Sequence, residues 1–222
     1  IDPAAGSASA PAMPEEIAPP IPEVEAPAVE AVPVVETLRV PGEYAPETYE
    51  PNYSYPLIVW LTTGEDDFDL TTTMEAVSDR NYLGLQVNLS RIFQAASETE
   101  GYIQQLHVHE LSLLKVVRGA IAKFRQNYKV HSERIYLAGT GLGAIAALHL
   151  GLSRPEWFGG VISIDAGVER IPQLLRRFRH LQGERVLLAH SRGSAETTRN
   201  AEMKLAMMLH AAGLRVSRWA YA

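Results

Sequence analysis

One glycine-rich stretch of this chain has the layout of a catalytic turn but lacks the atom that would do the chemistry. Residues 134–148 read as a buried strand, a turn and an apolar helix. The pattern G-x-S-x-G exposes a nucleophilic serine on a turn of this kind. Gly139 and Gly143 occupy the framing positions, but the serine position is Gly141. Because glycine has no hydroxyl, this turn cannot form an acyl-enzyme, and we expect no catalytic residue here.

Other residues with reactive side chains favour structural interpretations. Thr140 precedes the apex of the turn, at a position that normally packs into the scaffold. Ser163 and Asp165 end an apolar run, where a ligand could reach them, but a strand-end serine and a capping aspartate explain them better. The stretch from Gly139 to Gly143 does not fit a phosphate-binding loop, because it lacks both the G-x-G-x-x-G spacing and the lysine of a P-loop.

No metal or cofactor site is predicted. The chain has no cysteine, which excludes disulfides and zinc-thiolate sites. His107 and His109 are two residues apart and would point in different directions on a helix. His149 and His210 are interpreted as packing histidines. The acidic run at 65–69 lacks the spacing of a calcium loop and is typical of a helix N-terminus.

The charge of the chain is unevenly distributed. Residues 1–56 hold ten acidic residues, one basic residue and 12 of the 14 prolines. The remainder carries 16 acidic and 19 basic residues, an excess too small for a nucleic-acid-binding face. No apolar run approaches the roughly 20 residues of a membrane span, so we expect no direct membrane insertion.

Residues 1–35 are predicted to form an extended, proline-rich N-terminal arm. Proline removes backbone donors and favours extended conformations, and this segment shows no helical or strand periodicity. The arm is either a linker or a strap along a partner protein, to which it would tether the domain as part of a larger complex. Five apolar residues could anchor such a strap: Ile17, Ile21, Val24, Val29 and Val32.

Residues 36–222 are predicted to form one α/β domain, a mainly parallel sheet flanked by helices on both faces. Short apolar runs rich in β-branched residues alternate with longer runs of helical period. The expected strands are 55–61, 84–89, 134–138, 160–164, 185–189 and 214–219. The expected helices are 110–128, 142–153 and 196–212, the last ended by Gly213, and residues 36–55 are expected to supply a leading hairpin.

From about Val40 onward the chain resembles the α/β-hydrolase superfamily, in particular bacterial esterases of the phospholipase/carboxylesterase and polyhydroxyalkanoate-depolymerase type. The matching stretches are 55–61, 134–139 and 153–163, and the order of elements is kept along roughly 180 residues. The resemblance implies a sheet of the α/β-hydrolase type and a Ser-His-acid site at its edge.

The positions that carry catalysis in the family are altered here. The oxyanion loop after the first core strand reads Thr62 and Thr63 in place of His-Gly. The acid position corresponds to Ser194, with Glu196 close by as a substitute, and the nucleophile position is Gly141. The family histidine would follow the last strand, beyond residue 222, and the sequence leaves open whether further residues supply it.

These substitutions predict a non-catalytic pseudo-hydrolase that acts as a structural or interaction subunit. The alternatives are a residual carboxylesterase that uses Ser191 or Ser194, and a protein that binds a small acyl ligand. The expected vestigial pocket comprises Gly64, Gly141, Leu142, Asp165 and His190. Alanine-, proline- and glutamate-rich spacers often follow membrane anchors, which favours an extracytoplasmic, tethered protein, although a domain of a larger cytosolic chain fits equally well.

Overall fold

The computed structural model describes residues 42–64, 68–90, 99–169 and 180–222. The chain divides into two compact units, Ile1–Leu38 and Arg39–Ala222, and the description that follows is of the second. The predicted arm and its five apolar anchors lie outside the described residues.

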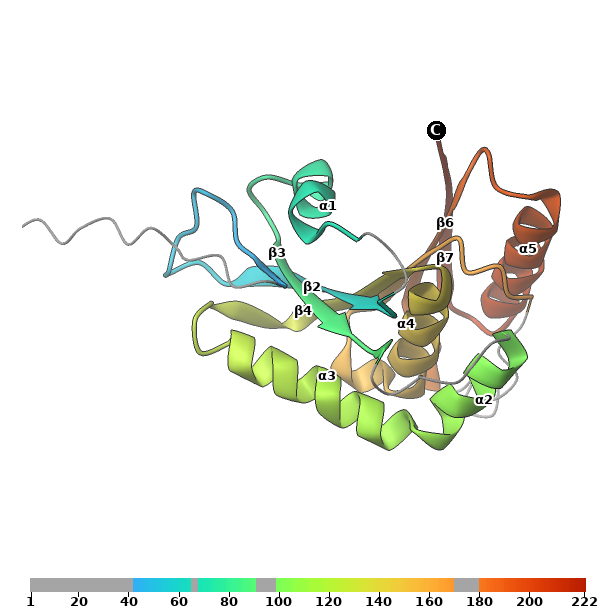
Figure 1. The fold of residues 1–222 in the computed structure, drawn as a ribbon, viewed down its shortest axis with the longest axis horizontal. Coiled ribbons are helices and arrows are strands. Elements are labelled where there is room, and N and C mark those ends of the chain that lie inside the picture. The colour runs from blue at the N-terminus through green and yellow to red at the C-terminus, as the bar shows by residue number, and fades with distance from the viewer. Residues whose placement is uncertain (1–41, 65–67, 91–98, 170–179) are drawn as a thin grey trace, which may run out of the picture. The chain divides into compact units, whose positions relative to one another are not determined.

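Seven strands form one sheet in the order β1-β3-β2-β4-β5-β6-β7 (Figure 1). All neighbouring strands pair in parallel except β1, which runs antiparallel to β3. The strands are β1 (Glu43–Tyr44), β2 (Tyr55–Thr62), β3 (Leu83–Asn88), β4 (Val130–Thr140), β5 (Gly160–Ile164), β6 (Arg185–Ser191) and β7 (Arg215–Tyr221).

The described helices cover the two faces of the sheet unequally. α2, α3, α4 and α5 pack on one face in the larger apolar core, and α1 packs on the other face over Ile58, Trp60 and Ala138. Figure 1 shows α1 and α3 on opposite sides of the strands. The helices are α1 (Leu70–Val77), α2 (Thr99–Val108), α3 (Glu110–Phe124), α4 (Gly141–Ser153) and α5 (Glu196–Ala211), with a short 3-10 turn at Pro155–Trp157.

The central elements are buried because each is covered on more than one side. Every residue of β2 is buried, as expected for a parallel strand between two helical layers. Residues 143–153 of α4 are buried on every side of the helix, which explains why its sequence is apolar throughout. α4 therefore sits at the centre of the domain, directly after β4.

The structure confirms the predicted α/β sheet with helices on both faces. At the start of the domain, β1 pairs with β3 and not with β2, while residues 36–41 of the expected hairpin lie outside the described residues. The sequence analysis also missed α2, whose apolar residues follow no strong helical stripe. Gly213 does follow the end of α5 with a positive φ of 87°, as predicted.

Among the described residues, no helix combines the length and the apolar character that a membrane crossing requires.

Candidate functional site

The carboxyl ends of the parallel strands bring the predicted site residues to one edge of the sheet. β2 ends at Thr62, β4 leads into Gly141, β5 leads into Asp165 and β6 ends at Ser191. Ligands of open α/β sheets bind at this edge, because the loops there diverge and leave room. The edge is therefore the first place to look for chemistry.

The turn at Gly141 has the backbone shape that exposes a nucleophile, without the nucleophile. Gly141 has a φ of 51°, in the left-handed region, and joins β4 directly to α4. A Cβ atom built at this position would meet no other atom within 4 Å. The turn thus points into open space at its apex, where a side chain would be accessible.

The two framing glycines are held in close contact with backbone. A Cβ on Gly139 would overlap the backbone of Gly143, and a Cβ on Gly143 would overlap the carbonyl oxygen of Leu61 in β2. Only glycine permits such an approach between a helix start and two strands. The sequence has therefore kept the residues that shape the turn while the apex residue carries no reactive atom.

Asp165 is the centre of a hydrogen-bonded group at the same edge. Its Oδ1 accepts hydrogen bonds from Ser194 Oγ at 2.6 Å and from Ser191 N at 3.2 Å. Its Oδ2 accepts a hydrogen bond from the Tyr221 hydroxyl at 2.6 Å. Asp165 itself adopts a φ of 52°, rare for a residue other than glycine. These contacts tie the end of β5 to the loop after β6 and to the end of β7.

The same contacts shift the titration of both acidic groups. Partial burial raises the pKa of Asp165, but the hydrogen bonds from Ser194, Tyr221 and Ser191 outweigh it, so the pKa lies below its usual value. Burial, with the hydrogen bond to Asp165 and its charge, raises the pKa of Tyr221 to about 12. Asp165 is therefore an ionised acceptor at neutral pH, and Tyr221 a donor.

This arrangement pairs Ser194 with a carboxylate, and no hydrogen bond between Ser194 and a histidine is present among the described residues. A serine nucleophile needs a base, usually histidine, to accept its proton. Ser194 Oγ donates instead to Asp165, and Ser191 Oγ accepts from the backbone N–H of Gly193. Glu196, considered as a substitute acid, is exposed in the first turn of α5.

The loop that would form an oxyanion hole begins with two threonines of different exposure. Thr62 is buried, and its Oγ1 accepts a hydrogen bond from Gln86 Nε2 at 3.3 Å, while Thr63 is half-buried. Gly64 is exposed and has a φ of 83°. Residues 65–67 lie outside the described residues.

Asp69 caps α1, as the acidic run predicted, and the hydrogen bonds of Thr72 lower the pKa of Asp69.

His190 takes part in a buried ion pair rather than standing free at the edge. Its Nδ1 lies 3.0 Å from Oε1 of Glu202 on α5, and Arg218 Nε lies 3.6 Å from the same oxygen. Both His190 and Glu202 are buried. Leu142, the remaining member of the predicted pocket, is half-buried against the larger core.

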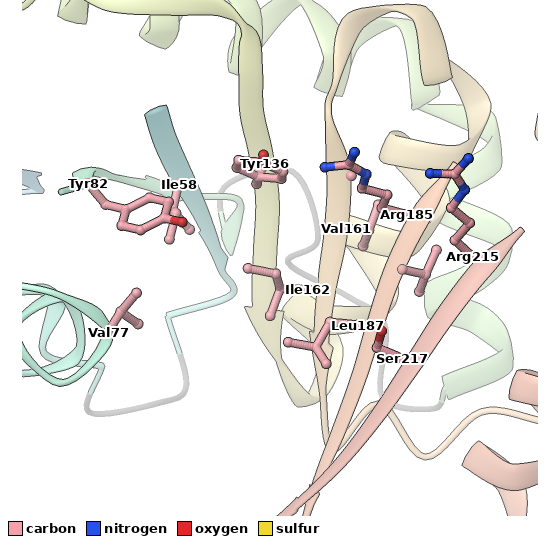
Figure 2. A pocket seen from close by; sticks show the side chains of 12 residues that line it. Ile58, Val77, Tyr82, Tyr136, Val161, Ile162, Arg185, Leu187, Arg215 and Ser217 are labelled. Carbon is pink, nitrogen blue, oxygen red and sulfur yellow. The ribbon is translucent and has the colours of Figure 1, made fainter. Parts of the chain in front are cut away.

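A cavity of about 630 Å³ lies on the sheet face that α1 covers only in part. Figure 2 shows Ile162 of β5, Leu187 of β6 and Ser217 of β7 along this face, with Arg185 and Arg215 at one end. Sequence reasoning missed this feature, because it depends on which face of the strands the described helices leave uncovered.

Outside the sheet edge, one group of described side chains could hold a metal ion. It consists of His107, Glu110 and His149, from three different helices. The sequence analysis had treated these histidines separately, as surface or packing residues.

Comparison with known proteins identifies the fold. The domain superposes on an acylaminoacyl peptidase of Pyrococcus horikoshii with a TM-score of 0.57 and 16% identity, over 80% of this chain and 33% of that one. The superposition on a ferulic acid esterase of Anaeromyces mucronatus has a TM-score of 0.53 and 13% identity. It covers 79% of this chain and 74% of the esterase. The superposition on a thermostable esterase has a TM-score of 0.51 and 18% identity. It covers 81% of this chain and 50% of that esterase.

The domain therefore has the α/β-hydrolase fold, as the resemblance implied. No family model and no curated protein sequence matches the chain. The chain spans half or less of the length of several of these structures, including the peptidase and the thermostable esterase. At such low identities the likeness shows the fold alone.

Proposed function

We propose that this chain is a non-catalytic protein of α/β-hydrolase fold that binds a partner protein. The observation that carries the proposal is Gly141, which stands without a side chain at the apex of an otherwise retained nucleophile turn. Selection on folding explains Gly139 and Gly143, whose replacement would collide with backbone. A side chain has space at 141, where the left-handed φ of 51° makes any residue other than glycine a modest strain, so glycine there is favoured by the backbone but not enforced by a collision.

The hydrogen bonding around Asp165 supports the same proposal. In a serine hydrolase the acid orients a histidine, and the histidine takes the proton of the nucleophile. Here the carboxylate accepts from Ser194 and Tyr221, and the nearby His190 is paired with Glu202. Asp165 is thereby engaged with the loop after β6 and with the end of β7, and His190 Nδ1 with α5. A residual esterase that uses Ser191 or Ser194 is therefore the weaker candidate.

The first test restores the missing hydroxyl. We expect Gly141→Ser to fold and to show no turnover of p-nitrophenyl acetate or butyrate above the wild-type background. The serine has room, but Asp165 and His190 at this edge are already hydrogen-bonded to Ser194, Tyr221 and Glu202. The measurement is ester hydrolysis by purified wild type and variant, with labelling by a fluorophosphonate.

Turnover by the single variant, or a fluorophosphonate adduct on wild-type Ser191 or Ser194, would refute the non-catalytic assignment. Gly141→Ala is the matched control, because it adds the same backbone strain without a hydroxyl. Circular dichroism and thermal melting of all three proteins establish that an inactive variant is folded.

The incompletely covered sheet face supports a protein as the partner. Parallel sheets are normally buried on both faces, and this face presents Ile162 and Leu187 in a surface cavity. Ser217 lines that cavity and Trp219, two residues along β7, lies on the same side and is 63% exposed. Exposed apolar surface of this kind marks interaction sites.

Two positive charges beside the cavity favour a partner segment that carries negative charge. Arg185 and Arg215 are exposed at one end of the apolar strip, on paired positions of β6 and β7. An amphipathic helix with an apolar stripe and carboxylates near one end would match both features, since helices are what cover the faces of such sheets. We therefore assign the face to a helix of a partner protein, with the arm of residues 1–35 as a second attachment to the same assembly.

Site-specific crosslinking tests this assignment. We expect the photoreactive residue benzoylphenylalanine at position 219 to crosslink the full chain to one partner protein in cells of the native source. The same residue at Leu111, 71% exposed on α3 of the opposite face, serves as control. Reversing both arginines, Arg185→Glu with Arg215→Glu, is expected to reduce the crosslinked fraction at least about tenfold.

Two outcomes would overturn the assignment of the sheet face, and a third would overturn the role of the arm. A crosslink only to a second copy of the chain would mean self-association, and equal products from positions 219 and 111 would mean non-specific contact. Full crosslinking after removal of residues 1–35 would dismiss the arm as an attachment but leave the sheet face in place.

A further inference from the structure

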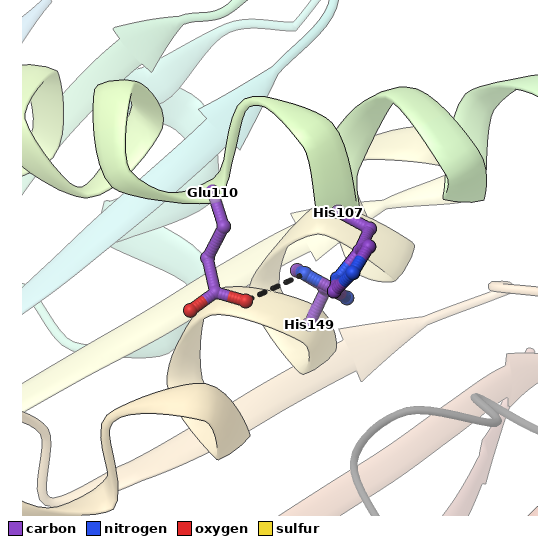
Figure 3. A group of neighbouring side chains, drawn as sticks. All are labelled: His107, Glu110 and His149. Carbon is purple, nitrogen blue, oxygen red and sulfur yellow. Dashed lines mark ion pairs between the residues drawn. The ribbon is translucent and has the colours of Figure 1, made fainter.

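Two histidines and a glutamate from three helices meet on the side of the domain that carries α2, α3 and α4. His107 lies in the last turn of α2, Glu110 is the first residue of α3, and His149 belongs to α4. Figure 3 shows the three side chains turned toward one another. One ligand atom of each lies within 4.8 Å of the others, and His149 Nε2 lies 3.3 Å from Glu110 Oε2.

His149 is the unusual member of this group. Its side chain is 1% exposed on a helix that is otherwise almost entirely apolar, and neither ring nitrogen makes a hydrogen bond of acceptable geometry. Burial without hydrogen bonds is unfavourable for an imidazole, and a leucine would fill such a position at less cost. The side chain therefore requires an explanation beyond packing.

The contacts of His149 suit a metal ligand. Neither of its buried ring nitrogens has a hydrogen-bond partner among the described residues, and an imidazole nitrogen offers a lone pair to a cation. Glu110 beside it would supply the negative charge.

We propose that His107, Glu110 and His149 bind a divalent transition-metal ion of the zinc type. Imidazole nitrogen and carboxylate oxygen are donors that such ions accept, and three protein ligands leave a fourth position for water or an anion. The hard ions Mg²⁺ and Ca²⁺ prefer sites made of oxygen alone, so the two histidines select against them.

The distances require only a small adjustment. Bonds of about 2.0–2.1 Å in a tetrahedral site place the donor atoms about 3.4 Å apart. Glu110 and His149 already have this separation, at 3.3 Å. His107 is exposed, and its ligand atom lies within 4.8 Å of those of the other two residues. The rings of His107 and His149 lie nearly perpendicular, with centroids 6.3 Å apart.

The position of the site indicates a structural role. His149 is eight residues along α4 from Gly141, which corresponds to about 12 Å of helix. The ion would therefore join the corner between α2 and α3 to the central helix, away from the sheet edge. This inference does not depend on the proposed partner or on the absence of catalysis.

The test uses the full chain without an affinity tag, stripped of metal by a chelator and dialysed. We expect one equivalent of Co²⁺ to give the visible absorption of a tetrahedral site, and Zn²⁺ to displace it. Zn²⁺ at a hundredfold excess over its dissociation constant is expected to raise the melting temperature by about 5 °C or more. His107→Gln and Glu110→Gln should each weaken Zn²⁺ binding at least about tenfold.

His109→Gln is the matched control, because it removes an exposed histidine two residues from His107 that is not part of the group. This variant should bind Zn²⁺ as the wild type does. Equal losses in His107→Gln and His109→Gln would refute the site, as would a melting temperature unchanged by 100-fold molar excess of Zn²⁺. His149→Gln is not needed, so the result does not depend on whether a variant of a buried residue folds.

Discussion

Replacing Gly143 by alanine is expected to lower the free energy of unfolding by about 3 kcal/mol or more, and can prevent folding altogether. The added Cβ would overlap the carbonyl oxygen of Leu61, a backbone atom that no side-chain rotation can move away. α4 cannot retreat as a unit, because residues 143–153 are buried on all sides. The clash must therefore distort β2 or the start of α4.

The control for this prediction is Gly141→Ala, two residues earlier in the same turn. Its Cβ meets nothing within 4 Å, so the only cost is the left-handed backbone, about 1 kcal/mol. Urea denaturation of both variants measures the difference. Equal stabilities would show that the turn does not hold α4 against β2 as closely as described, and would remove the structural reason given for Gly143.

The second large effect is expected at the buried pair of His190 and Glu202. We expect Glu202→Ala to cost about 3 kcal/mol, because it leaves the His190 ring buried without its hydrogen-bonding partner and opens a cavity under α5. Arg218, on β7, loses the same carboxylate. Glu202→Gln retains the shape and one acceptor and should cost clearly less.

An exposed ion pair between Lys204 of the same helix and Glu169, which follows β5, provides the comparison. Lys204 Nζ lies 2.6 Å from Glu169 Oε1, with both side chains more than half exposed. Solvent screening and side-chain entropy make such pairs worth 0–1 kcal/mol, so Lys204→Ala should change stability by less than about 0.5 kcal/mol. A loss in Glu202→Ala no larger than in Lys204→Ala would mean that the His190 pair does not stabilise the fold.

Sequence patterns located most of the sheet because buried strands and helices impose their own periods. The continuous apolar run at 55–61 and the β-branched run at 160–164 correspond closely to β2 and β5. The turn at 139–143 was also evident, since its glycines are required by backbone approach. Patterns of this kind are local, so they can be recognised in a single sequence.

The same patterns could not predict which distant segments of the chain pair or pack together. β1 has only two residues, and their side chains do not indicate that β3 is the strand with which β1 pairs. α2 has a weak apolar stripe, because it packs with few residues against α4. His107 and His149 were judged separately, since 42 positions divide them and only the crossing of the helices brings them together.

The sequence by itself determined the class of fold and the lack of a hydroxyl at residue 141. Both follow from composition along the chain: the period of the apolar residues, and the identity of one residue in a turn. The tertiary structure alone decided the environment of Asp165, the partner of His190, the incompletely covered sheet face and the meeting of His107, Glu110 and His149. Those features arise where separate elements pack, and the hydrogen bonds and contacts formed there depend on distances between elements that no local pattern encodes.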